Sequence, residues 1–253
     1  MKAYRTRNIF DRSSNKPFKI SRSKFENFLK CERCFYLDRV MGVNFPSSPP
    51  FTLNNLVDDL LKKEFDSHRE AQTAHPLFET ISFKGVPYKH DDIEKWRDSL
   101  RSGVQYLDEK NNLILSGGVD DVWLDQSNDS IVVVDYKATS KTGGIPEDIL
   151  EQPFYGAYKT QLDFYSWLFK RNGFEVANYG YFMFCNGIKT KQDFGASMDF
   201  EYKFIKYNPR TDWIDEKIDE LKKCLMREDV PQINDECENC TYSKTVSKVY
   251  IND

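Results

Sequence analysis

Three charged side chains of this chain have the types and spacing needed for chemistry on phosphate esters. Asp135 and Lys137 are two residues apart, and Asp120 precedes them. Aspartates supply the oxygen ligands that Mg²⁺ and Mn²⁺ accept, and a nearby ammonium can lower the pKa of a water molecule or stabilise extra negative charge on phosphorus. Tyr136, between the pair, is expected to lend only its backbone carbonyl. The pattern therefore favours a divalent-metal site that acts on phosphate.

Two predicted strands must position these side chains. Alternating apolar residues predict a strand that ends near Leu124 and contains Asp120, and the β-branched run 131–134 predicts a second strand. A polar turn is expected over 125–130. Because strand side chains alternate with period two, the aspartate and the lysine at the end of the second strand are expected on the same side.

A helix is predicted over 158–170, about twenty-five residues beyond the second strand. In it Gln161 and Tyr165 are four residues apart and therefore lie on one face. The chain thus reads G-x-x-D from Gly117, then D-x-K, then Q-x-x-x-Y. A single D-x-K at a strand end ordinarily marks a solvated terminus, but the three elements in this order resemble the PD-(D/E)XK nuclease superfamily, specifically its RecB-like branch.

The resemblance implies metal-dependent hydrolysis of DNA phosphodiesters, with single-stranded DNA or DNA ends as substrate, in repair, recombination or defence. It implies that Asp120 and Asp135 hold one or two Mg²⁺ or Mn²⁺ ions with help from the carbonyl of Tyr136. Lys137 is then expected to position or activate the attacking water. The residues expected to orient the site or to contact DNA are Gln161 and Tyr165.

A further metal ligand is expected on a helix predicted to begin at Thr52 or Asn54, in which Asp58 lies beside the apolar stripe. The RecB-like nucleases often place a metal-binding histidine there, and this chain offers a carboxylate instead. The other interpretation of Asp58 is an acid on a solvated helix surface.

Four of the six cysteines form two C-x-x-C pairs near opposite ends of the chain. The pairs are Cys31 with Cys34 and Cys237 with Cys240. Two such pairs predict a four-thiolate metal site that closes the chain on itself. The first pair lies within a helix predicted over about 24–40. The other cysteines, Cys185 and Cys224, are expected to be ordinary buried thiols.

The segment around the first cysteine pair, L-K-C-E-R-C-F-Y-L, resembles the segment that supplies the first cluster ligand in iron–sulfur members of the RecB-like branch. Those members include the AddB nuclease domain and CRISPR-associated RecB-like nucleases. The resemblance implies a [4Fe-4S] cluster, with Zn²⁺ as the alternative. The relatives place another cysteine where this chain has Val246, so Cys34 is the candidate for the fourth ligand.

Composition and charge indicate a globular protein with a basic N-terminal segment. With 40% hydrophobic and 30% charged residues, the chain of 253 residues is expected to be globular and soluble. No run has the length of a signal peptide core or a membrane span, so we expect a cytoplasmic protein. Residues 1–40 carry eleven Lys and Arg against four acids, whereas the whole chain has a net charge of −4. A basic terminus on an acidic body predicts a contact with DNA, or else only aids solubility.

The element order predicts an α/β fold with a central mixed sheet flanked by helices, and the resemblance implies a restriction-endonuclease-like, RecB-type core. We expect a basic arm over residues 1–20, one nuclease-like domain over 21–242 closed by the cysteines, and a polar tail over 243–253. Two alternative functions remain: a catalytically silent nucleic-acid-binding module whose zinc or iron–sulfur site is structural, and a redox-sensing cluster protein.

Overall fold

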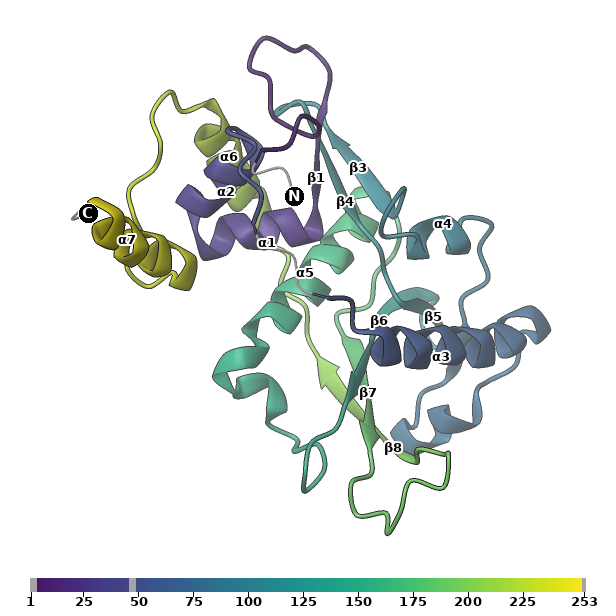
Figure 1. Ribbon diagram of the computed structural model, residues 1–253. Helices are drawn as coiled ribbons and strands as arrows, with labels where there is room; N and C mark the ends of the chain where they lie inside the picture. Colours follow the sequence, from purple (N-terminus) through teal and green to yellow (C-terminus); the bar gives the residue numbers. More distant parts are fainter. Residues whose placement is uncertain (1–3, 46–48, 252–253) are drawn as a thin grey trace. The chain divides into compact units, whose positions relative to one another are not determined.

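The computed structural model describes residues 4–45 and 49–251, and the chain forms two compact units (Figure 1). Unit 1 combines the N-terminal region up to Ser48 with residues 106–116 and with the chain from Asp212 onward. Unit 2 comprises Pro49–Gln105 and Gly117–Thr211. The predicted division into arm, domain and tail stays a prediction, and parts of the arm and of the tail lie outside the described residues.

Unit 1 holds a three-stranded sheet and four helices. The strand order is β1-β4-β3, and β1 runs parallel to β4. The strands are β1 (Phe18–Ser21), β3 (Val104–Asp108) and β4 (Leu113–Gly117). The helices are α1 (Arg22–Lys30), α2 (Glu32–Arg39), α6 (Ile214–Met226) and α7 (Glu238–Ile251). The end of the predicted basic arm is therefore strand β1, and the predicted polar tail is largely helical.

The helix predicted over 24–40 is wrong in one respect, because the chain breaks it at Cys31. Cys31 is extended, with φ of −165° and ψ of 108°, and ends α1. Its Sγ accepts the backbone N–H of Cys34 at 3.4 Å and so caps α2. An apolar stripe does not reveal this break, since the two short helices keep the same periodicity.

Unit 2 is built on a five-stranded mixed sheet of order β2-β5-β6-β7-β8, in which only the β6 and β7 pair is parallel. The strands are β2 (Gly85–Pro87), β5 (Asp121–Asp125), β6 (Ser130–Thr139), β7 (Gly180–Gly187) and β8 (Phe200–Tyr207). The α-helices are α3 (Thr52–Ala71), α4 (Ile93–Arg97) and α5 (Gly156–Arg171). Short 3₁₀ turns are η1 (Pro76–Ile81), η2 (Ile149–Glu151) and η3 (Pro153–Tyr155).

Alternation along β6 separates two packed faces of this sheet. Val134 and Tyr136 belong to a core cluster that includes Phe65 of α3. The intervening side chain of Lys137 points the other way, toward Tyr158 and Gln161 of α5. Helices α3 and α5 therefore cover opposite faces. Asp135 and Lys137 lie on the same side of β6, as predicted, and this side faces α5.

The predicted first strand of the hairpin is wrong, because it is two strands in different sheets. β4 ends at Gly117 and pairs with β1, whereas β5 begins at Asp121 and pairs with β6. Asp120 accordingly precedes β5 instead of lying inside a strand. The chain is closely packed at this break, because a Cβ on Gly117 would lie 2.5 Å from Cε1 of Tyr165. β6 also continues to Thr139, so Asp135 and Lys137 lie within it.

The α/β class and the mixed sheet flanked by helices are confirmed, with two sheets where the sequence predicted one. The predicted basic arm is partly anchored, since Arg5 forms an ion pair with Asp38. Within residues 4–45 and 49–251 no helix is both long enough and apolar enough to cross a membrane.

Candidate active site

Strand β6 presents a buried ion pair to helix α5. Asp135 has no exposed surface, and the ammonium of Lys137 forms an ion pair with its carboxylate. Lys137 Nζ also donates to Oε1 of Gln161 at 3.1 Å and lies 4.3 Å from the ring centroid of Tyr158. Burial lowers the pKa of Lys137, but Asp135 and Asp120 outweigh it and raise the pKa overall. The lysine is therefore a fixed cation.

A hydrogen bond from the backbone of β6 holds Asp120 against that strand. Its Oδ2 accepts the N–H of Tyr136 at 2.8 Å. Burial and the nearby charge of Asp135 raise the pKa of Asp120 to about 7. Two carboxylates that share a poorly solvated site repel each other, and a bound cation relieves that repulsion.

Asp58 meets these groups across a cavity of about 290 Å³. Asp58, Asp120, Lys137 and Tyr158 all contribute to its wall. Lys62, one turn along α3, donates to Oδ2 of Asp58 at 2.5 Å. The pKa of Asp58 is raised by burial and by the charge of Asp120. The carboxylate thus lies at the cavity and not on an open helix surface, although its role as a metal ligand stays a prediction.

The oxygen atoms around this cavity fit a divalent cation. Oδ1 of Asp58 and Oδ1 of Asp135 are buried, and neither accepts a hydrogen bond from the described residues. Buried carboxylate oxygens without a donor are costly unless a cation balances them. Carboxylate and carbonyl oxygens are also the ligands that Mg²⁺ and Mn²⁺ take in preference to sulfur.

The two helical residues of the predicted motif have different positions. Gln161 contacts Lys137 directly, while its Nε2 donates to the hydroxyl of Tyr165 at 3.2 Å. Tyr165 is only 4% exposed and packs against Gly117. Gln161 therefore links Lys137 to α5, and the hydroxyl of Tyr165 accepts a hydrogen bond that holds Gln161 in place.

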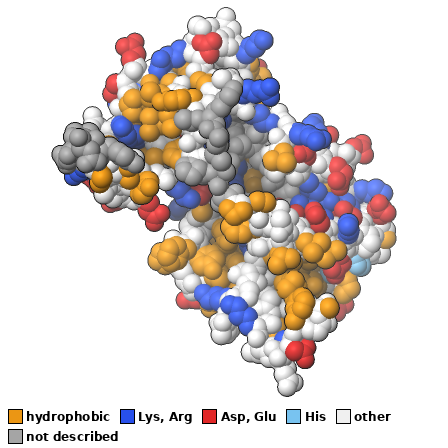
Figure 2. Space-filling model, viewed as in Figure 1, with side chains coloured by type: hydrophobic (Ala, Val, Ile, Leu, Met, Phe, Trp, Pro, Cys, Tyr) orange, Lys and Arg blue, Asp and Glu red, His pale blue; other side chains and the backbone are white. Residues whose placement is uncertain are grey.

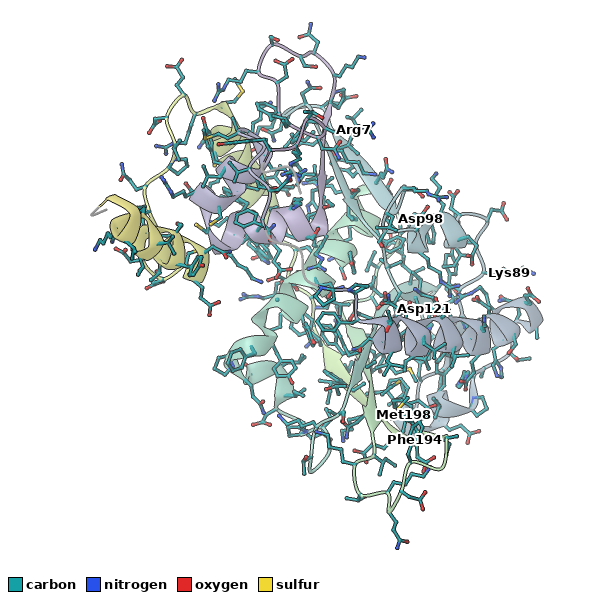
Figure 3. All side chains as sticks on the ribbon, in the orientation of Figure 1. Arg7, Lys89, Asp98, Asp121, Phe194 and Met198 are labelled. Carbon is teal, nitrogen blue, oxygen red and sulfur yellow. The ribbon has the colours of Figure 1, made fainter. Side chains whose placement is uncertain are left out.

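A buried network beside the site is missing from the sequence prediction. Asp121 has no exposed surface and accepts hydrogen bonds from Arg97 at 3.0 Å, from Trp123 at 3.1 Å and from the Tyr136 hydroxyl at 2.7 Å. Arg69 of α3 also pairs with it. Burial alone raises the pKa of Asp121, but the two arginines hold it below its ordinary value. Figure 3 shows Asp121 beside α3.

Through Arg69, Asp121 and the Tyr136 hydroxyl this network joins α3 to β5 and β6, next to Asp120 and Asp135. The sequence offers one signal for it, the Asp-Asp pair that Asp121 forms with Asp120. The two arginines lie far from that pair along the chain, so no local pattern reveals them.

The four cysteines of the two pairs gather in unit 1. Sγ of Cys31 lies 3.6 Å from that of Cys240, and Sγ of Cys34 lies 3.6 Å from that of Cys237 and 3.7 Å from that of Cys240. All four sulfur atoms are within 4.8 Å of one another. The group can bind a metal, and among the described residues it is the one cluster of such side chains that converges this closely.

The remaining two cysteines lie apart from this group. Both Cys185 and Cys224 are buried. Cys185 belongs to the core cluster of the large sheet. Cys224 Sγ contacts the carbonyl oxygen of Glu32 at 3.8 Å. They fit the predicted role of ordinary buried thiols.

Strand β6 thus carries an Asp-x-Lys, with a second aspartate beside it and a helical glutamine bound to the lysine. The family model of the PD-(D/E)XK nuclease superfamily matches residues 19–245. The chain therefore belongs to the PD-(D/E)XK nuclease superfamily, whose members are typically metal-dependent nucleases. No individual curated protein matches it.

Proposed function

We propose that this protein is a RecB-like deoxyribonuclease that hydrolyses DNA phosphodiesters with Mg²⁺ or Mn²⁺, acting on single-stranded DNA or DNA ends. The observation that carries the proposal is the convergence of Asp120, Asp135 and Lys137 at one buried site, with Asp58 across the adjoining cavity. Superfamily membership supports the same reaction class.

Asp120, Asp135 and the carbonyl of Tyr136 are the groups that would hold the cation, together with Asp58 of α3. The unpaired buried oxygens of Asp58 and Asp135 support this assignment. When bound, the cation supplies Lewis acidity and lowers the pKa of a coordinated water. The backbone N–H of Tyr136 orients Asp120 for its part in the site.

Lys137 orients the attacking water and stabilises negative charge on the phosphate. Its ammonium is fixed by Asp135, Gln161 and the face of the Tyr158 ring, so little reorganisation is needed during the reaction. The raised pKa keeps it protonated at neutral pH. Its role is therefore that of a positioned cation and hydrogen-bond donor, with Gln161 as its positioning partner.

The resemblance implies a [4Fe-4S] cluster at the four-cysteine site, but from the sulfur separations we infer its alternative, zinc. A tetrahedral zinc site with Zn–S bonds of about 2.3 Å requires sulfur atoms about 3.8 Å apart. Three of the six Sγ separations, at 3.6, 3.6 and 3.7 Å, are close to that value, and all four sulfur atoms lie within 4.8 Å of one another. A [4Fe-4S] cluster attaches each thiolate to a different iron and needs a wider separation. We expect a colourless protein with stoichiometric zinc, whereas brown protein with four irons would overturn this choice.

The nuclease proposal is tested by incubating the protein with 5′-labelled single-stranded DNA in Mg²⁺, in Mn²⁺ and in EDTA. We expect products with either metal ion, none with EDTA, and none from Asp135→Asn. Tight DNA binding without any cleavage by the parent protein would instead support a catalytically silent binding module.

A further inference from the structure

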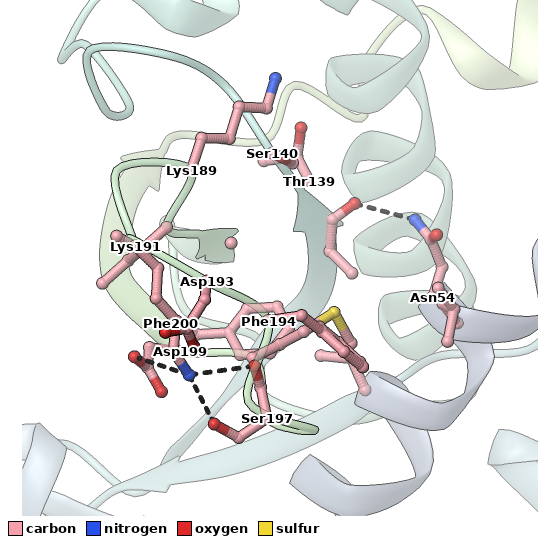
Figure 4. A pocket seen from close by; sticks show the side chains of 16 residues that line it. Asn54, Thr139, Ser140, Lys189, Lys191, Asp193, Phe194, Ser197, Asp199 and Phe200 are labelled. Carbon is pink, nitrogen blue, oxygen red and sulfur yellow. Dashed lines mark hydrogen bonds and ion pairs between the residues drawn. The ribbon is translucent and has the colours of Figure 1, made fainter.

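A second cavity adjoins the catalytic cavity in unit 2. Its volume is about 570 Å³, which lies in the range of small-molecule pockets. Asn54, Val57 and Ala138 line both cavities, so the two lie side by side. Asn54 donates to the carbonyl oxygen of Ala138 at 2.9 Å, and this contact lies at the shared wall (Figure 4). We call the second cavity the side groove.

Large apolar side chains surround the side groove and are left exposed to water. Phe194 is 69% exposed, Leu53 is 59% exposed and Met198 is 50% exposed. Hydrophobic side chains gather over α3 and the loop between β7 and β8 in Figure 2, and Phe194 and Met198 lie on that loop in Figure 3. Scattered exposed apolar residues are ordinary, but a set around one groove indicates a binding surface.

The rim of the groove carries two lysines, Lys189 and Lys191, and two acids, Asp193 and Asp199. Lys191 is fixed by Asp199 at 3.6 Å and by Oγ of Ser197 at 2.5 Å. Lys189 also lines the groove, and its side chain extends away from these groups (Figure 4). Proteins bind single-stranded nucleic acid with exposed rings and lysines along one groove, since bases stack on rings and phosphates attract cations.

We propose that the side groove holds one unpaired nucleobase of the DNA strand whose phosphodiester lies in the catalytic cavity. The base stacks on Phe194 against the apolar wall, and Lys189 faces an adjacent phosphate. This inference rests on the proposed nuclease function. A paired base is enclosed by its partner and its stacked neighbours, so the groove selects single-stranded DNA or frayed ends over an intact duplex.

The test measures binding of a fluorescently labelled single-stranded oligonucleotide to the full chain, with Ca²⁺ replacing Mg²⁺ so that cleavage does not interfere. Phe194→Ala should weaken binding by about five- to a hundredfold, the range for loss of one stacked base. The matched control is Leu100→Ala, because Leu100 is 93% exposed and lines neither cavity. The control should bind like the parent.

A second arm locates the base. A series of oligonucleotides, each with one abasic site at a different position, is bound to the parent and to Phe194→Ala. At one position the abasic site should weaken binding by the parent but cause no further loss of affinity in the Phe194→Ala variant. The proposal is overturned if the affinity losses from the abasic site and from Phe194→Ala add at every position, or if Phe194→Ala binds like the parent. Failure of the parent to bind single-stranded DNA overturns it as well. If the groove behaves as proposed but the parent never cleaves with Mg²⁺ or Mn²⁺, only the nuclease function fails.

Discussion

Replacing Asp121 with alanine should destabilise unit 2 far more than the loss of a surface ion pair. The carboxylate is fully buried and balances two arginines whose own side chains are nearly buried: Arg69 is 5% exposed and Arg97 is 6% exposed. Without Asp121 the acidic partners that remain are Asp66, which is 33% exposed and pairs with both arginines, and Glu94, which is 80% exposed and pairs with Arg97. The perturbation therefore leaves uncompensated positive charge in the protein interior.

The expected cost follows from that geometry. Removing one partner of a buried ion pair destabilises a protein by about 3–5 kcal/mol. Asp121→Ala also removes the acceptor for the Tyr136 hydroxyl, and hydrogen bonds to a charged group contribute about 1.5–3 kcal/mol each. Because these terms share one carboxylate they do not add fully, and we expect a total of about 3–5 kcal/mol.

Urea unfolding followed by tryptophan fluorescence measures this loss, since Trp96, Trp123 and Trp167 all lie in unit 2. The control is Glu147→Ala, which removes a carboxylate that is 79% exposed and paired with Lys203. It should cost at most about 1 kcal/mol. A loss for Asp121→Ala no larger than that of the control would refute the role assigned to this network.

Three further predictions concern the site and the N-terminal region. The pKa of Asp120 is raised to about 7, so below that pH Mn²⁺ must displace a proton from the carboxylate. Calorimetry should therefore show that the Mn²⁺ affinity falls as the pH drops below about 7 and becomes constant above it. Gly117→Ala should push against Tyr165 and cost about 1–3 kcal/mol in urea unfolding, with a loss of cleavage; parent-like behaviour would contradict the packing. Arg7→Gln with Lys16→Gln should reduce the slope of log affinity against log salt by about 2, and an unchanged slope would mark the basic arm as a solubility feature.

Much of the candidate site follows from local sequence rules. The period of two along a strand correctly places Asp135 and Lys137 on one face, and the spacing of four correctly links Gln161 with Tyr165. The paired C-x-x-C motifs predict a four-sulfur group because thiolates at that spacing share a ligand site.

The remainder depends on contacts between distant segments. Alternating apolar residues look the same in one long strand and in two short strands of different sheets, so the alternation does not show the break after Gly117. The adjacent glycines Gly117 and Gly118 are the local signal for it. The pairing of Asp121 with Arg69 and Arg97 requires α3 and α4 to meet β5. The side groove likewise forms only when Phe194 approaches Leu53 across a long chain separation.

The most direct test compares Asp135→Ala with Lys137→Ala, measuring Mn²⁺ binding by calorimetry and cleavage of single-stranded DNA by a time course. Asp135→Ala should lose both Mn²⁺ affinity and cleavage, because it removes a metal-binding carboxylate. Lys137→Ala removes a cation that repels the metal ion, so Mn²⁺ affinity should persist or rise while turnover falls by a factor of about 10² or more. Cleavage by Lys137→Ala at the rate of the parent would contradict the assignment of this site as a nuclease centre.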